Sequence, residues 1–366
     1  MHYHIILTEV CNLKCKYCYE KSMHEFDNGL EEKFDYDMET PVDSEVPIEN
    51  LKSFLKPADT LIFYGGEPLV RMEKMIEIMD NVNCNFQIQT NGMLLNKLPT
   101  KYLLKLDKML VSIDGTKERD NWGKGNLHYD KIINNLKDIR NRGFKGEIVA
   151  RMVISESDIY AQVMHLVELI KQGLYNSVHW QIDAGFYKFD FDETKFTKFV
   201  KEYNKGISEL IEFWTKEIKK GKVWKFYPFL GILNRLRGWD KNTKLPCGAG
   251  HNNFTINTSG KLSACPIMNS VKNLYCGDIE TGVTKEIHIN NCNNCDYVNI
   301  CGGRCLYWRE AKLWPKVGDD LICETIKHLI DEIKKIIPEV NNSIEKGIVK
   351  KEDFDFEKYF GPEIIP

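Results

Sequence analysis

The sequence has no long hydrophobic run, and none of its 366 residues belongs to a stretch that approaches the length of a membrane span. It also lacks a secretory signal, because no basic segment followed by an apolar run and a small-residue cleavage site stands at its N-terminus. These two absences exclude an integral membrane protein and an exported one. We therefore expect a cytoplasmic protein without a membrane partner.

A large excess of charge of one sign is absent as well. The 50 lysines and arginines face 53 acidic residues, the formal net charge is −3, and no tract is rich in basic residues. A protein that follows a nucleic-acid backbone needs such a tract, so nucleic acid is not an expected partner. The chain has no internal repeat and no low-complexity segment, and its length allows two or three domains.

Cysteine, by contrast, is abundant, with twelve residues in a chain that carries no export signal. The cytosol keeps thiols reduced, so metal ligation explains these cysteines better than disulfides do. They form an N-terminal group of three and a C-terminal group that runs from Cys247 to Cys323. Cys84 stands alone before a predicted strand and is interpreted as a small buried hydrophobic residue.

The N-terminal group lies in the segment CNLKCKYCY, residues 11–19, which follows a short apolar run. Cys11, Cys15 and Cys18 can surround one small inorganic cluster and leave one metal corner without a protein ligand. Such an open corner is where chemistry takes place. A structural zinc site is the alternative, but zinc normally takes four protein ligands, and the next nearby candidate is only His24.

This segment resembles the C-x3-C-x2-C motif of the radical S-adenosylmethionine (SAM) enzymes, in which an aromatic residue, here Tyr17, precedes the last cysteine. The resemblance implies that the three cysteines hold a 4Fe-4S cluster and that SAM chelates its fourth iron. One electron then splits SAM into methionine and a 5′-deoxyadenosyl radical, which abstracts a hydrogen atom from the substrate. A low-potential electron donor such as ferredoxin or flavodoxin is the implied partner.

The run YGGEP, residues 64–68, matches the second motif of the same family. A glycine pair lets the backbone approach a ligand closely, and a carboxylate at a strand end accepts a hydrogen bond from an ammonium group. The resemblance assigns Gly65, Gly66 and Glu67 to the methionyl amine of SAM. Further SAM-binding candidates follow at later strand ends, where ordinary turn and barrel-lining roles are the alternatives. They are Asn91, Ser112, Asp114 and Arg151.

Segments with strand and helix periods alternate six times over residues 2–183, which favours parallel strands joined by helical crossovers. The predicted strands are 2–8, 60–64, 85–91, 109–115, 146–155 and 177–183, with a short helix over 101–109. Pattern alone also permits a doubly wound open sheet, whereas the family resemblance favours a partial (β/α)6 barrel. Either α/β fold places the site at the carboxyl ends of the strands.

The last predicted strand carries polar residues with a period of two. His179, Gln181 and Asp183 alternate with apolar neighbours and therefore share one face. A polar barrel interior that is satisfied by its own neighbours is one interpretation. The functional hypothesis is that Asp183 lines the substrate cavity and takes part in catalysis.

The C-terminal cysteines resemble the seven-cysteine pattern of SPASM domains, the extensions of peptide- and protein-modifying radical SAM enzymes. The resemblance implies two auxiliary 4Fe-4S clusters, and a structural zinc ribbon is the alternative. The implied ligands of the first auxiliary cluster are Cys247, Cys265 and Cys305. Those of the second are Cys292, Cys295, Cys301 and Cys323. Cys276 lies outside this pattern and is a candidate for an eighth ligand.

These observations divide the chain into four predicted parts. They are a radical SAM partial barrel at 1–190, a helical and aromatic bridge at 191–245, a small cysteine-rich α+β SPASM domain at 246–325, and a C-terminal helix and tail at 326–366. The first strand is expected at residue 2, with no leader-binding domain before it. The acidic stretch at 20–49 is expected to be a solvated flap.

The favoured hypothesis is an enzyme that abstracts a hydrogen atom from a residue of a peptide or protein, with cross-linking, epimerisation and oxidation all open. A noncatalytic zinc or iron-sulfur adaptor is the hypothesis from another class. A formylglycine-forming maturase of the anaerobic sulfatase type is the third. Those maturases carry an aspartate, used as a base, after the cysteine equivalent to Cys265, whereas this chain has Pro266 there.

Overall fold

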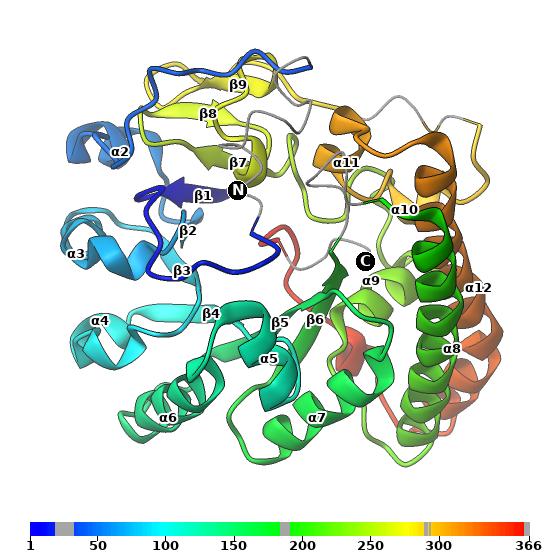
Figure 1. Ribbon diagram of the computed structural model, residues 1–366. Helices are drawn as coiled ribbons and strands as arrows, with labels where there is room; N and C mark the ends of the chain where they lie inside the picture. Colours follow the sequence, from blue (N-terminus) through cyan, green and yellow to red (C-terminus); the bar gives the residue numbers. More distant parts are fainter. Residues whose placement is uncertain (19–32, 184–190, 289–291, 293, 362–366) are drawn as a thin grey trace.

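Six parallel strands in chain order carry the N-terminal motifs (Figure 1). The computed structural model describes residues 1–18, 33–183, 191–288, 292 and 294–361, so part of the predicted acidic flap lies outside the described residues. The strands are β1 (His2–Ile6), β2 (Thr60–Tyr64), β3 (Asn85–Thr90), β4 (Leu106–Ser112), β5 (Glu147–Ile154) and β6 (Ser177–Ile182). Most of their side chains are buried, because a parallel sheet of this kind is covered on both faces.

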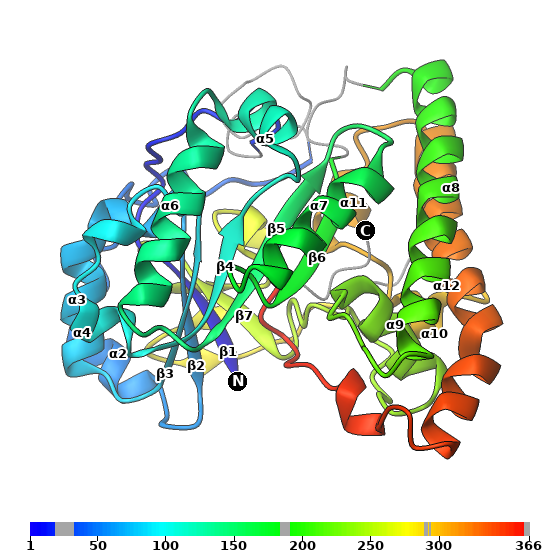
Figure 2. The ribbon, with the colours of Figure 1, turned by 90° about the horizontal axis from the view of Figure 1, so that it is seen from below.

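Helices connect successive strands on the outer side of the sheet (Figures 1 and 2). They are α2 (Ile48–Phe54), α3 (Met72–Asn81), α4 (Thr100–Leu103), α5 (Lys117–Lys124), α6 (His128–Asn141) and α7 (Ile159–Lys171). In α6, Ile132, Leu136 and Ile139 recur at helical spacing and are fully buried against the sheet. Helix α5 is polar instead, and the hydroxyl of Thr116 caps its first turn.

The strand order decides between the two predicted folds. A doubly wound sheet reverses its order at a switch point, whereas β1 to β6 follow one another without reversal. The strands run in an arc with the helices outside it (Figure 1). The partial barrel is confirmed. The helix expected over 101–109 ends already at Leu103, because β4 begins at Leu106 and pairs with strands on both of its edges.

The cysteine-rich region continues the same sheet. Strand β7 (Asn253–Ile256) pairs in parallel with the edge of β1 that faces away from β2, and antiparallel strands follow outward. These are β8 (Lys261–Ser263), β9 (Tyr275–Asp278) and β10 (Gly282–Val283), followed by the short helices α10 (Val298–Cys301) and α11 (Leu306–Ala311). The predicted α+β character of this region is confirmed. The four domain limits remain predictions.

Helices α8 (Glu193–Ile218) and α12 (Lys316–Glu345) lie side by side beyond β6 (Figures 1 and 2). The aromatic segment between the barrel and the cysteine-rich region forms α9 (Tyr227–Leu236), where Phe229 meets Trp180 of β6 edge to face. This segment is therefore packed core. Within the described ranges, no helix has the length and apolar character of a membrane span.

The C-terminal segment returns to the amino-end opening of the barrel. After the short helix η5 (Lys351–Phe354), Glu357 lies 2.9 Å from His2 Nε2 and pairs with Lys108 Nζ at 2.8 Å. Lys108 pairs equally closely with Glu147 of β5. Phe360 is fully buried in a small apolar cluster inside the barrel. This segment therefore closes the floor of the barrel, opposite the carboxyl ends of the strands.

Replacing Glu357 with glutamine should lower the free energy of unfolding by about 2 kcal/mol, because Lys108 then keeps a buried charge with one fewer counter-charge. Burial raises the pKa of Glu357, but its contacts with His2 and Lys108 outweigh burial and lower it to about 2. The stability that the carboxylate contributes is therefore complete above pH 4.5 and is lost as the pH falls towards 2.

Thermal unfolding at neutral and acid pH measures the difference in stability between Glu357→Gln and the parent protein. This difference should become smaller in acid. Glu352→Gln is the matched control, because Glu352 lies in the same segment and is exposed. Equal unfolding curves for Glu357→Gln and the parent protein at neutral pH would contradict the assignment of this floor.

Candidate functional site

Three cysteines on the segment after β1 line one cavity at the carboxyl ends of the strands, here called the first cavity. Cys11, Cys15 and Cys18 line it together with residues of β2 to β6. Burial raises the pKa of the Cys15 thiol to about 12, although the nearby charge of Lys124 lowers it. A thiol with this pKa is ionised when a metal ion displaces its proton.

The glycine pair after β2 packs against the backbone that leaves β1. A β-carbon on Gly65 would lie 2.2 Å from the carbonyl oxygen of Thr8, and one on Gly66 would lie 2.6 Å from that of Val10. Gly65 also has a φ of +131°, which other residues rarely adopt. The N–H group of Glu67 donates to the carbonyl oxygen of Val10 at 3.0 Å. The two glycines therefore bring Glu67 against the cysteine segment.

Glu67 is fully buried and accepts three hydrogen bonds. Its Oε1 accepts from the Thr90 hydroxyl at 2.6 Å and from the N–H of Leu69 at 3.1 Å, and its Oε2 accepts from the N–H of Asn91 at 2.7 Å. A carboxylate has about four acceptor positions, so one position remains for a ligand. Burial raises the pKa of Glu67 to about 7, although these hydrogen bonds lower it.

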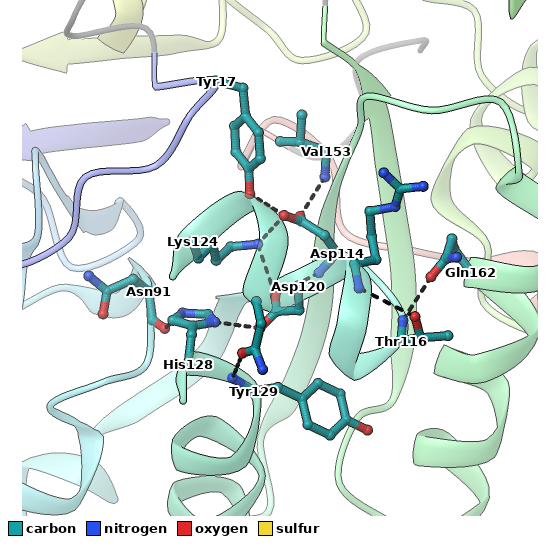
Figure 3. A network of polar contacts seen from close by, with 12 residues as sticks. Tyr17, Asn91, Asp114, Thr116, Asp120, Lys124, His128, Tyr129, Val153 and Gln162 are labelled. Carbon is teal, nitrogen blue, oxygen red and sulfur yellow. Dashed lines mark hydrogen bonds and ion pairs between the residues drawn. The ribbon is translucent and has the colours of Figure 1, made fainter. Parts of the chain in front are cut away.

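Asp114 follows β4 and joins the cysteine segment to β5 (Figure 3). Its Oδ1 accepts from the N–H of Val153 at 3.0 Å, while its Oδ2 accepts from the Tyr17 hydroxyl and from Lys124 Nζ. Burial, followed by the charge of Asp114, raises the pKa of Tyr17 well above its ordinary value. The Tyr17 hydroxyl therefore remains a donor and holds the aromatic ring at the cavity.

Strands β5 and β6 supply the opposite wall. Arg151 contacts His179 Nδ1 at 2.9 Å and donates to Gln181 Oε1 at 2.8 Å, so the period of two in β6 does place these two side chains on one face. Ser112 of β4 is the register partner of Arg151. Asp183 follows β6 and also lines the first cavity.

The first cavity brings together every residue that the sequence predicts for the N-terminal site. These are Cys11, Cys15, Tyr17, Cys18, Gly65, Gly66, Glu67, Asn91, Ser112, Asp114, Arg151 and Asp183. Gln89 and Lys124 line it too and were not predicted. The signal for Lys124 is weak, because a lysine four residues after an aspartate is typical of an exposed helical pair.

Two further cavities are lined by C-terminal cysteines. The second cavity is lined by Cys247, Cys265 and Cys305. The third cavity is lined by Cys292, Cys295, Cys301 and Cys323. These are the two predicted ligand sets without Cys276, which is buried on β9, where its thiol donates to the carbonyl oxygen of Leu274 at 3.5 Å. The described structure does not bring Cys276 to the lining of either cavity.

The sequence model of the radical SAM superfamily matches residues 5–170, the span that contains the cysteine segment and Glu67. Residues 5–170 are a radical SAM domain. The chain is therefore an enzyme rather than the noncatalytic adaptor. Its family implies a 4Fe-4S cluster and SAM as cofactors.

Relatives of this radical SAM enzyme extend over nearly its whole length. The radical SAM cyclopropyl synthase TigE of Paramaledivibacter caminithermalis is 22% identical over 91% of this chain and 74% of TigE. A cysteine-type anaerobic sulfatase-maturating enzyme of Clostridium perfringens is 22% identical over 92% of this chain and 96% of its own. The structure of native anSMEcpe with bound AdoMet and Kp18Cys peptide covers 93% of this chain and 99% of its own, with a TM-score of 0.63 and 18% identity. The fold likeness therefore includes the cysteine-rich region.

The first cavity of this radical SAM enzyme fits both cofactors. Three thiols would supply the protein ligands of an iron-sulfur cluster, and the open acceptor position of Glu67 suits an ammonium group such as that of SAM. In the described ranges, no three His, Cys, Asp or Glu side chains converge closely enough for a single metal ion. The cysteines surround a cavity instead, which is an arrangement suited to a group several atoms wide.

The raised pKa of Glu67 predicts that SAM binds more weakly in acid, with Glu67 proposed as the acceptor of its ammonium group. Only the ionised carboxylate attracts this group, so affinity should be complete above pH 7 and fall by about tenfold per pH unit below it. Equilibrium dialysis of SAM with the anaerobically reconstituted enzyme measures this profile. Glu67→Gln should bind weakly at every pH, and a flat profile for the parent enzyme would rule the role out.

Proposed function

We propose that this radical SAM enzyme abstracts a hydrogen atom from a residue of a peptide or protein substrate and thereby modifies it after translation. The observation that carries this proposal is the adjacency of the first and second cavities. Both are lined by Tyr64, Gln89, Arg151, Gln181 and Ile267. When bound, the cluster and SAM supply the radical that removes hydrogen. A substrate residue in the adjoining cavities would lie between that chemistry and the cysteines of the second cavity.

The relatives support a peptide or protein as substrate. The anSMEcpe structure holds a Kp18Cys peptide, and the enzyme of C. perfringens is named for the maturation of sulfatases. TigE is named as a cyclopropyl synthase, so the names of these relatives describe different reactions. We therefore propose the reaction at the level of its class, which includes cross-linking, epimerisation and side-chain oxidation.

Formylglycine formation is the second candidate, because the likeness to the sulfatase-maturating enzyme covers nearly all of that protein. Pro266 argues against it. This residue follows Cys265, begins a short 3-10 helix and lines the second cavity, where the maturases have an aspartate. A proline side chain cannot accept a proton. In this chain we assign the substrate-facing carboxylate to Asp183.

We further propose auxiliary 4Fe-4S clusters in the second and third cavities. Beside the third cavity, Arg309 donates to Cys323 Sγ at 3.2 Å. Burial lowers the pKa of Arg309, but Cys323 and Asp319 outweigh burial and raise it above its ordinary value. A guanidinium in this place compensates the negative charge of ligating thiolates. A low-potential donor such as ferredoxin or flavodoxin would supply the electron that starts the reaction.

Anaerobic reconstitution should yield about 12 Fe per chain, with four in each of three clusters. Cys15→Ala should retain about 8 Fe, because its loss affects only the first cavity, and should abolish reductant-dependent 5′-deoxyadenosine formation. Cys84→Ala is the control and should retain both the full iron content and the activity, because Cys84 lines none of the three cavities. A colourless zinc protein that leaves SAM intact would contradict the proposal.

Asp183→Asn should lower turnover of the natural peptide substrate by about 100-fold if Asp183 moves a proton to or from it. Formation of 5′-deoxyadenosine without substrate should stay unchanged, because the proposed SAM contacts are intact. A pull-down from cell extract supplies the substrate, and mass spectrometry measures its modification. Asp192→Asn is the matched control at the exposed N-terminus of α8. Unchanged turnover by Asp183→Asn would remove Asp183 from the catalytic site.

A further inference from the structure

Three titratable residues of α5 and α6 are buried at the wall of the first cavity, which Lys124 itself lines, and have no role in the proposed reaction. Asp120 is 0% exposed, His128 1% and Lys124 6%. Figure 3 shows them side by side between Asp114 and Asn91. Charged groups are rarely buried so completely unless each one is paired, so their partners define what they do.

Lys124 joins the two aspartates. Its Nζ contacts Asp114 Oδ2 and lies 3.1 Å from Asp120 Oδ1. Asp120 Oδ1 also accepts from the backbone N–H of Asp114 at 3.0 Å. Asp114 is thus held at both its backbone and its side chain, and its Oδ2 in turn accepts from the Tyr17 hydroxyl. Burial lowers the pKa of Lys124, but the charges of Asp114 and Asp120 outweigh burial and raise it.

His128 continues the chain of contacts in the other direction. Its Nδ1 lies 2.5 Å from Asp120 Oδ2, and its Nε2 lies 3.2 Å from the backbone oxygen of Asn91. His128 therefore joins Asp120 to the segment that carries Asn91 through its two ring nitrogens.

This chain of contacts ends at Glu67, on the side of the first cavity formed by β2 and β3. Asn91, whose oxygen His128 contacts, donates its own N–H to Glu67 Oε2 at 2.7 Å. One continuous polar path therefore joins the two walls. It runs through Tyr17, Asp114, Lys124, Asp120, His128, Asn91 and Glu67.

We propose that Asp120, Lys124 and His128 are positioning residues that fix the separation of the two ends of the SAM site. This inference rests on the proposed function and on the SAM contacts that the family resemblance implies, with Glu67 at the amine of SAM and Asp114 at the ribose. A long ligand that is held at both ends binds tightly only when the two contact groups stay at the matching distance. The ionic path supplies that constraint.

Stability alone does not account for this arrangement. Replacing a buried ion pair by apolar residues of similar volume is often neutral or stabilising, so a buried charged set is weak evidence for a stabilising role. Gly123 is further evidence that α5 serves the SAM site, because a β-carbon there would lie 2.7 Å from the Tyr17 ring and only glycine leaves room for it. The α5 segment is thus shaped to receive Tyr17 as well as to hold Asp114.

The test compares Lys124→Met with Lys108→Met in the full-length, anaerobically reconstituted enzyme. Lys108 is the matched control, because it is also a buried lysine between two carboxylates but lies at the floor of the barrel. Lys124→Met should raise the dissociation constant for SAM by about 10-fold to 100-fold, as loss of a supporting contact behind a binding group typically does. Lys108→Met should lower the melting temperature and leave SAM affinity unchanged. Equilibrium dialysis measures affinity independently of turnover.

Unchanged SAM affinity in Lys124→Met, or an equal loss in both variants, would overturn the proposal. If Lys124→Met does not fold, His128→Asn and His128→Gln decide instead. Asparagine reproduces the contact of Nδ1 with Asp120 and glutamine that of Nε2 with Asn91, so each variant breaks the path on one side only. Both should weaken SAM binding, and parent-like affinity in either overturns the proposal. A parent enzyme that binds no SAM would instead refute the proposed function on which the inference rests.

Discussion

Strand β1 is hydrogen-bonded on both edges, and the arrangement of the cavities depends on this double pairing. Its residue His2 is in register with Thr60 of β2 on one side and with Asn253 of β7 on the other. A strand held on both sides cannot slip by one residue without turning its buried side chains to the opposite face. The cysteine segment therefore leaves the sheet at one defined point. That point lies between the Glu67 segment and the cysteine-rich region, so the first and second cavities adjoin.

The barrel interior is organised by two buried lysines, one near each end. Lys124 lies between Asp114 and Asp120 at the carboxyl ends, and Lys108 lies between two glutamates at the amino ends. An apolar layer with Phe360 separates the two levels. Lys108 joins carboxylates from β5 and from the C-terminal segment, whereas Lys124 joins α5 to the end of β4, so each lysine holds neighbouring elements together. The barrel is therefore closed at the amino ends of its strands, and the side of the first cavity next to α5 is held in place by ionic contacts.

Much of the N-terminal site was predictable, because the carboxyl ends of parallel strands meet at one edge, and the motifs lie at those ends. Helix α5 was missed because its sequence KERDNWGK has no apolar stripe and its burial rests on ionic contacts, which hydrophobic periodicity cannot detect. The pairing of β7 was missed because a strand of four residues gives too short a pattern. The inward turn of the C-terminal segment depends on Glu357 meeting Lys108, a contact between residues about 250 positions apart that no local pattern encodes.

The segment from Cys301 to Cys305 joins the third cavity to the second. Gly302, Gly303 and Arg304 have φ values of +67°, +97° and +67°, and a β-carbon on Gly302 would lie 2.2 Å from a neighbouring carbonyl oxygen. Arg304 adopts the left-handed conformation without being glycine, which costs about 1–2 kcal/mol. Burial lowers the pKa of its guanidinium, and the negative charge that Cys305 and Cys301 would carry as metal ligands would favour the buried cation. Four extended residues span at most about 14 Å, and left-handed turns shorten that reach. Metal clusters bound in the two cavities would therefore be joined by a single tight turn of the backbone. Ligation by Cys301 and Cys305 would offset the strain of that turn.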